Sequence, residues 1–192
     1  MTALVLCAVV LGALLHFLLS AGGPERPAIG DSSLPDGYGG LEAPLSEADG
    51  LVPGGAAAFD DGIPAVSNLT PDLHDALRMA VSDAADTGIG ISITSGWRSR
   101  QYQEQLLQDA IADYGSETEA ARWVATPDTS AHVSGDAVDV GPTPAAQWLS
   151  AHGARYGLCQ IYDNEPWHYE LRPDARLYGC PARYADPSQW LQ

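Results

Sequence analysis

An uncharged apolar run from Ala3 to Leu19 constrains this chain most, because as a membrane anchor or as a signal peptide it would direct the rest of the chain across a membrane. A run of this length is near the lower limit of about 17–25 residues for a transmembrane helix and exceeds the apolar core of about 7–15 residues in a typical signal peptide. A helix buried in the domain core is the alternative. We predict that residues 1–22 form a signal anchor or a signal peptide. The rest of the chain is then extracytoplasmic, held at the membrane by the apolar segment or secreted after its cleavage.

The composition changes after this run. Residues 23–67 are dense in Gly, Pro, Asp and Glu and show no sustained apolar periodicity. Such a stretch buries too little apolar surface to offset the entropy lost on ordering. We therefore predict a flexible linker over residues 23–67 and a folded domain over residues 68–192.

Acidic residues dominate the charge, with 25 Asp and Glu against 9 basic residues and a formal net charge of -16. Nucleic-acid binding starts with basic side chains that neutralise phosphates, so a nucleic-acid partner is excluded. The same excess argues against adhesion to anionic lipid through a basic patch. Nothing in the sequence requires an oligomer, and we expect a monomer.

Helical and strand patterns follow one another in the predicted domain. Thr70-Pro71-Asp72 is a typical helix start, and apolar residues then recur at helical spacing until Gly88. Further helices are predicted for residues 100–113, 117–124 and 144–152, and strands for residues 89–93, 137–141, 158–162 and 167–171, the last two forming a hairpin. Helices flanking a small antiparallel sheet make an α+β domain.

Two of the three cysteines, Cys159 and Cys180, lie in the predicted domain. An even pair in an exported protein typically forms a disulfide. Closing a loop of about 20 residues stabilises a fold by about 3 kcal/mol. Two buried free thiols are the alternative. A metal site at these cysteines is disfavoured, because no C-x-x-C spacing is present.

Most of the chemically reactive side chains lie in residues 95–99, 130–139 and 165–168. His132 and Asp139 can meet at one point if a turn leads into the strand predicted at residues 137–141. His168, from another strand, completes a set of two imidazoles and one carboxylate. Three protein ligands with an open fourth position are typical of a catalytic zinc. Glu165 then lies beside the metal and is suited to act as a general base.

These motifs, in this order, resemble the zinc D-alanyl-D-alanine carboxypeptidases of the VanY type. Residues 130–139 match the pattern S-x-H-x-x-G-x-A-x-D, and residues 96–99 match G-[YW]-R-S. The last motif reads E-P-W-H where the usual spelling is E-x-x-W-H. The resemblance covers roughly residues 69–171.

The resemblance implies a compact α+β domain with zinc above an antiparallel sheet, acting on peptidoglycan stem peptides of the cell wall. It implies that Arg98 polarises the scissile carbonyl and stabilises the oxyanion, and that Glu165 is the catalytic base. Zn²⁺ would be bound by His132, Asp139 and His168, and the peptide substrate would be held by Gln103, Ser130 and Ser99.

Two other functions stay open at this point. One is an endopeptidase that cleaves between L-alanine and D-glutamate of the stem peptide; such enzymes share the His and Asp pair but are closer to an Asp where this chain has Glu165. The other is a non-catalytic wall-binding module. Such a module would be expected to lack the base or Arg98, and both residues are present.

Overall fold

Four short strands form one antiparallel sheet in the computed structural model, which describes residues 44–189. The strand order is β1-β2-β4-β3, so β2 and β4 are the two central strands. The strands are β1 (Ser92–Ser95), β2 (Ala137–Gly141), β3 (Leu158–Gln160) and β4 (His168–Leu171). The predicted α+β class with a small antiparallel sheet and flanking helices is confirmed.

One face of the sheet carries the hydrophobic core. Successive side chains of a strand point to opposite faces, and Val138 of β2 pairs with Tyr169 of β4. Helices α2 (Pro71–Asp86) and α6 (Thr143–His152) pack on this face. The core includes large side chains from α2, α6 and all four strands: Leu73, Leu77, Ile93, Val138, Leu149, Leu158 and Tyr169.

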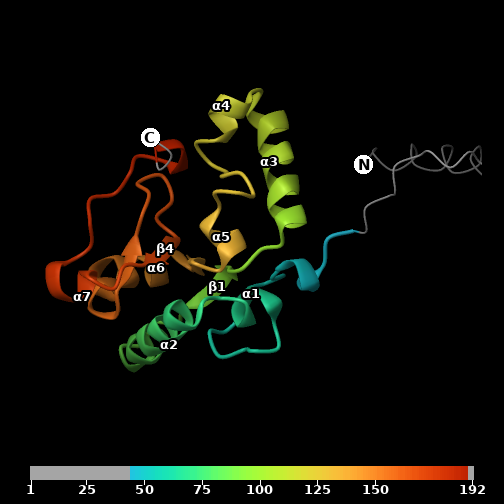
Figure 1. Ribbon diagram of the computed structural model, residues 1–192. Coiled ribbons are helices and arrows are strands. Elements are labelled where there is room, and N and C mark those ends of the chain that lie inside the picture. The colour runs from blue at the N-terminus through green and yellow to red at the C-terminus, as the bar shows by residue number, and fades with distance from the viewer. Residues whose placement is uncertain (1–43, 190–192) are drawn as a thin grey trace, which may run out of the picture. The chain divides into compact units, whose positions relative to one another are not determined.

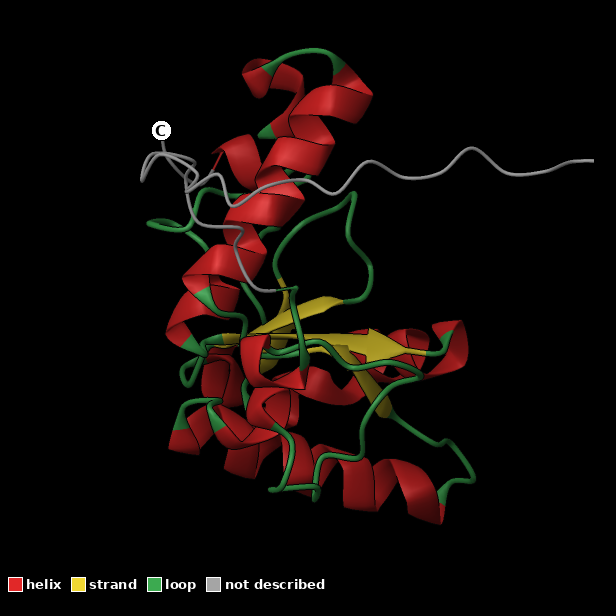
Figure 2. Cartoon of the chain, turned by 90° about the vertical axis from the view of Figure 1, so that its right-hand side faces the viewer, coloured by secondary structure: helices red, strands yellow, loops and turns green. Residues whose placement is uncertain are grey.

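The helices α3 (Arg100–Tyr114), α4 (Glu117–Ala120) and α5 (Ala131–Ser134) lie outside this core. Figures 1 and 2 show that α3 and α4 lie on one side of the sheet and extend away from it, while α2 lies on the other side. Ser99 caps the N-terminus of α3, because its hydroxyl accepts a hydrogen bond from the Tyr102 amide at 3.0 Å. The remaining short helices are α1 (Pro64–Ser67), α7 (Ala175–Tyr178), η1 (Glu47–Asp49), η2 (Gly153–Tyr156) and η3 (Pro187–Gln189).

Most of the predicted elements are present, with three differences. The strand expected at 89–93 is observed at Ser92–Ser95, because pairing with β2 begins only at Ser92. The helix expected over 117–124 ends at Ala120, after which the Arg122 and Trp123 amides bond to carbonyls three residues back, as in a tight turn. The turn expected around His132 is the single helical turn α5.

The ordered domain begins further toward the N-terminus than the expected start near Asn68. Ala56 pairs with Ile93 as an isolated bridge, and Ala58, Ala65 and Val66 are buried. Residues 44–67 are therefore part of the domain and not of a flexible linker. They were missed because their apolar residues are few and follow neither a helical nor a strand period. The predicted linker residues 23–43 and the predicted anchor or signal peptide, 1–22, lie outside the described residues.

No helix among residues 44–189 is long and apolar enough to span a bilayer.

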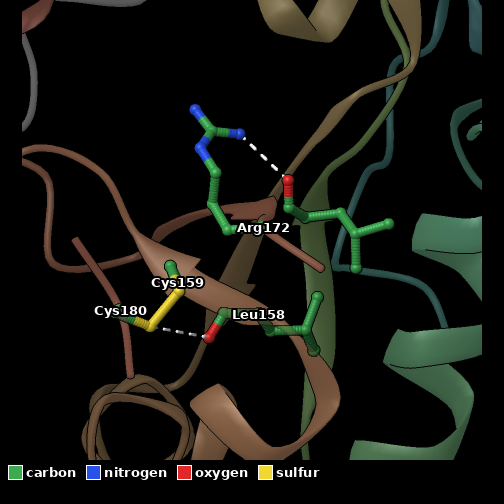
Figure 3. Close-up of a disulfide and its surroundings, with 5 residues drawn as sticks. Leu158, Cys159, Arg172 and Cys180 are labelled. Carbon is green, nitrogen blue, oxygen red and sulfur yellow. Dashed lines mark hydrogen bonds between the residues drawn. A yellow bond between two sulfur atoms is a disulfide. The ribbon is translucent and has the colours of Figure 1, made fainter. Parts of the chain in front are cut away.

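The predicted disulfide between Cys159 and Cys180 is confirmed, with an S–S distance of 2.00 Å. It joins β3 to the segment that follows α7 (Figure 3).

Residues 44–67 should contribute directly to stability. Removing them exposes the core face that Val66 and three alanines cover, so we expect a chain of residues 68–192 to unfold with about 3–5 kcal/mol less free energy than one of residues 44–192. Urea unfolding followed by circular dichroism measures the difference. Equal unfolding free energies would show that residues 44–67 are not part of the core.

Candidate active site

The three predicted metal ligands meet on the face of the sheet opposite the core. Asp139 of β2 is paired directly with His168 of β4, so both side chains rise from neighbouring positions. His132 comes from α5, which is followed by the capping residue Gly135 with φ 79°. The close approach of Gly135 to the Asn68 carbonyl leaves no room for a Cβ there and holds α5 against the start of α2.

One atom of each ligand lies at the corner of a small triangle. His132 Nε2 is 3.2 Å from His168 Nδ1 and 3.4 Å from Asp139 Oδ1, and His168 Nδ1 is 3.1 Å from Asp139 Oδ1. Ligands at about 2.0–2.1 Å around a tetrahedral zinc are separated by about 3.3 Å. The triangle therefore has the size that a zinc ion requires.

Hydrogen bonds on the far side of each imidazole determine which nitrogen faces the triangle. The Nδ1–H of His132 donates to the Gly96 carbonyl at 2.8 Å, and the Nε2–H of His168 donates to Glu170 at 3.1 Å. Each ring then presents a lone pair to the triangle, where the Asp139 carboxylate adds another. Three converging lone pairs repel one another unless a cation or a proton lies between them, so this donor set fits a metal ion.

Protonation of these groups follows the same geometry. Burial lowers the pKa of His168, but its hydrogen bonds with Asp139 and Glu170 outweigh this effect and raise the pKa to about 9. Burial and the charge of Arg98 lower the pKa of His132. The pKa of Asp139 lies well below its usual value despite burial, because both histidines and Arg98 favour its charged form.

Arg98 is anchored beside the ligands by three hydrogen bonds. Its Nη2 donates to Asp139 Oδ2 at 3.0 Å, its Nε donates to Ser95 at 2.8 Å, and its Nη1 donates to Gln103 at 3.1 Å. The Arg98 amide also donates to the carbonyl of His132. This network fixes the orientation of Asp139 and keeps the guanidinium in the pocket.

Glu165, the predicted base, lies next to the triangle. Its Oε2 is 3.8 Å from His168 Nδ1, and the side chain is largely buried. Burial raises the pKa of the Glu165 carboxyl to about 7, with Asp139 adding to the rise and His168 and Arg98 opposing it. A carboxyl with such a pKa can both accept and donate a proton near neutral pH.

A pocket of about 290 Å³ surrounds this constellation. The predicted residues Arg98, Gln103 and Ser130 line it, together with the three ligands and Glu165. Gln103 is bonded on both sides, because its Oε1 accepts from Arg98 and its Nε2 donates to the Ala125 carbonyl at 2.8 Å. It therefore supports Arg98, and its contact with substrate stays a prediction.

Ser99 does not line this pocket. Its hydroxyl caps α3 and donates to Asp49 at 3.0 Å, so the structure gives it a capping role, and its contact with substrate also stays a prediction.

Sequence reasoning missed three residues of the site. Ser95 accepts a hydrogen bond from Arg98, Tyr162 lines the pocket, and Glu170 accepts a hydrogen bond from His168. The position of Glu170 was the available signal, because residues two apart on a strand share a face and Glu170 follows His168 by two.

The raised pKa of Glu165 makes stability depend on pH in the metal-free protein. A carboxyl whose pKa is about 7 when folded, against 4.5 when unfolded, takes up a proton on folding, so stability falls as pH rises through this window. We expect Glu165→Gln to gain up to about 3 kcal/mol of unfolding free energy relative to the parent between pH 4.5 and pH 8. Urea unfolding in a chelator measures this, with Glu104→Gln on the exposed surface of α3 as the control. A difference that does not change with pH would contradict the shifted pKa.

Comparisons with known proteins identify the family to which this domain is similar. A family model described as VanY, D-alanyl-D-alanine carboxypeptidase, matches residues 66–174, more than half of the chain. A D-alanyl-D-alanine carboxypeptidase of Enterococcus faecalis (strain ATCC 700802 / V583) is 30% identical in an alignment 129 residues long, and the match covers 54% of this chain and 46% of that protein. The chain thus spans about half the length of this curated relative.

Two solved structures are similar to the domain. One is a mutant of the vancomycin resistance D,D-pentapeptidase VanY from the VanB-type cassette in complex with Zn(II), with a TM-score of 0.51, 25% identity, and coverage of 54% of this chain and 72% of that chain. The other is VanYB in complex with D-alanine-D-alanine, with a TM-score of 0.51, 25% identity, and coverage of 54% and 71%. On the match over residues 66–174, the chain belongs to the VanY family of D-alanyl-D-alanine carboxypeptidases.

Proposed function

We propose that this chain is a zinc-dependent carboxypeptidase that hydrolyses the terminal D-Ala-D-Ala bond of peptidoglycan stem peptides. The observation that carries the proposal is the triangle of His132 Nε2, Asp139 Oδ1 and His168 Nδ1 with the Glu165 carboxylate beside it. The similar structures with Zn(II) and with D-alanine-D-alanine support both the metal and the substrate.

His132, Asp139 and His168 would hold a zinc ion, which would supply Lewis acidity to the scissile carbonyl and would make a water more acidic. Glu165 accepts the proton of the attacking water at its carboxylate, which its position beside His168 Nδ1 allows. The protonated carboxyl then gives this proton to the leaving amine of the terminal D-alanine. A pKa near 7 serves both transfers.

Arg98 stabilises the negative charge that develops on the carbonyl oxygen. A guanidinium has five N–H donors, and three of those in Arg98 are bonded to Ser95, Gln103 and Asp139. The other two belong to a side chain that lines the pocket. Because the three bonds hold the group in place before substrate arrives, little reorganisation is needed in the transition state.

The space around the site suits a peptide longer than two residues. The catalytic pocket has a volume of about 290 Å³, and a second hollow of about 950 Å³ adjoins it. Both are lined by Thr129, Ser130, Ala131 and Tyr162. We assign the smaller pocket to the terminal dipeptide and the larger hollow to the preceding part of the stem peptide.

The proposed site of action is outside the cytoplasmic membrane, where stem peptides are found. The disulfide supports this location, because such bonds persist in oxidising compartments. The apolar run Ala3–Leu19 would bring the domain there, as an anchor or as a cleaved signal. We propose that the domain acts as a monomer.

Product analysis tests this function. We expect the zinc-loaded chain to release one D-alanine from a pentapeptide ending in D-Ala-D-Ala, and Glu165→Ala to lower kcat by about 10²–10⁴-fold while keeping bound zinc. Mass spectrometry identifies the products, and Glu119→Ala on the surface of α4 is the matched control.

Other products would redirect the assignment. Cleavage between L-alanine and D-glutamate would indicate the endopeptidase. Release of D-alanine only from a tetrapeptide, which ends in a single D-alanine, would overturn the D-Ala-D-Ala specificity. Zinc binding without cleavage of any stem peptide would favour a wall-binding module.

A further inference from the structure

The mechanism above leaves one buried acid of the site without a role. Glu170 of β4 is 6% exposed and lies two residues after His168, on the same face of the sheet. Its neighbours across the two adjoining strands are Ala137 of β2 and Cys159 of β3. A carboxylate enclosed in this way is costly unless both of its oxygens are paired.

Both oxygens of Glu170 are paired. Oε1 accepts the hydrogen bond from His168 Nε2 at 3.1 Å, and Oε2 accepts one from Arg172 Nη2 at 2.6 Å. Glu170 is therefore held by hydrogen bonds between one ligand of the triangle and one arginine.

Glu170 cannot itself be a fourth ligand. It bonds to Nε2, whereas Nδ1 of the same ring faces Asp139 and His132. The two nitrogens lie on opposite sides of the imidazole, so the carboxylate and the triangle are separated by the ring. The contact can act on a metal only through His168.

We propose that Glu170 is a positioning residue, held by Arg172, that fixes the orientation and tautomer of His168 so that Nδ1 is presented to the metal. The inference rests on the zinc site of the proposed function. A carboxylate behind a ligating histidine keeps the proton on the distal nitrogen and makes the ligating nitrogen more basic, and losing it typically lowers metal affinity about 10–100-fold.

The arrangement completes a set in which each ligand has its own support. His132 is oriented by the Gly96 carbonyl, Asp139 by Arg98, and His168 by Glu170. Arg172 follows β4, and its amide donates to the Gly157 carbonyl, which ties its backbone to the turn before β3. Figure 3 shows Arg172 in the neighbourhood of the disulfide between Cys159 and Cys180.

Zinc affinity, measured on the full chain by competition with a chromophoric chelator, tests the proposal without relying on turnover. We expect Glu170→Ala to weaken zinc binding about 10–100-fold. Glu170→Gln, whose amide oxygen can still accept from Nε2, should recover most of the affinity, and Arg172→Gln should lie between the parent and Glu170→Ala. Asp186→Ala is the matched control, because Asp186 is equally buried and pairs with Arg122 instead of with a ligand.

A second readout separates positioning from general support of the fold. In the zinc-bound parent the Nε2 proton of His168 should give a hydrogen-bonded signal in ¹H–¹⁵N spectra, retained in Glu170→Gln and lost in Glu170→Ala. Unchanged affinity in Glu170→Ala, or a loss as large in Asp186→Ala, would overturn the proposal while leaving the proposed function intact. A parent chain that binds no zinc would overturn both. If Glu170→Ala does not fold, an affinity of Arg172→Gln equal to that of the parent overturns the proposal.

Discussion

The pairing of Asp139 with His168 across β2 and β4 is the contact on which the site depends. It places a carboxylate and an imidazole side by side on one face, while their neighbours Val138 and Tyr169 enter the core on the other. Because side chains alternate along a strand, a slip of one residue would bury the ligands and expose the core. The hydrophobic core thus sets the register that creates the metal site.

The site also contains a row of buried and half-buried charges that support one another. Arg98 bonds to Asp139, Asp139 contacts His168, His168 donates to Glu170, and Glu170 pairs with Arg172. Signs alternate along this row, so no buried charge is left unpaired, which in a poorly solvated environment would be costly. Glu165 lies beside the row, with its Oε2 3.8 Å from His168 Nδ1, and burial raises the pKa of its carboxyl to about 7. In the proposed mechanism this carboxyl transfers protons, while Asp139 holds the metal and Glu170 orients His168.

Much of this arrangement could be predicted because it rests on local patterns. The alternation over residues 137–141 placed Asp139 on the face opposite Val138, and the motifs around His132 and His168 pointed to the residues that the structure brings together with it. Residues 44–67 could not be predicted to be ordered, since Val66 and its neighbouring alanines follow no period and are buried only by tertiary contacts. The hydrogen bond from the Ser99 hydroxyl to Asp49, fifty positions away in sequence, is likewise a tertiary contact that no local pattern reveals.

The most direct test of this account is the position of the metal. Anomalous diffraction at the zinc edge from crystals grown with zinc should show one site, about 2.0–2.1 Å from His132 Nε2, Asp139 Oδ1 and His168 Nδ1. Glu165 should lie beside the ion without binding it, and Glu170 should remain on the far side of the His168 ring. No anomalous peak within this triangle, or a zinc bound through His168 Nε2, would contradict the account.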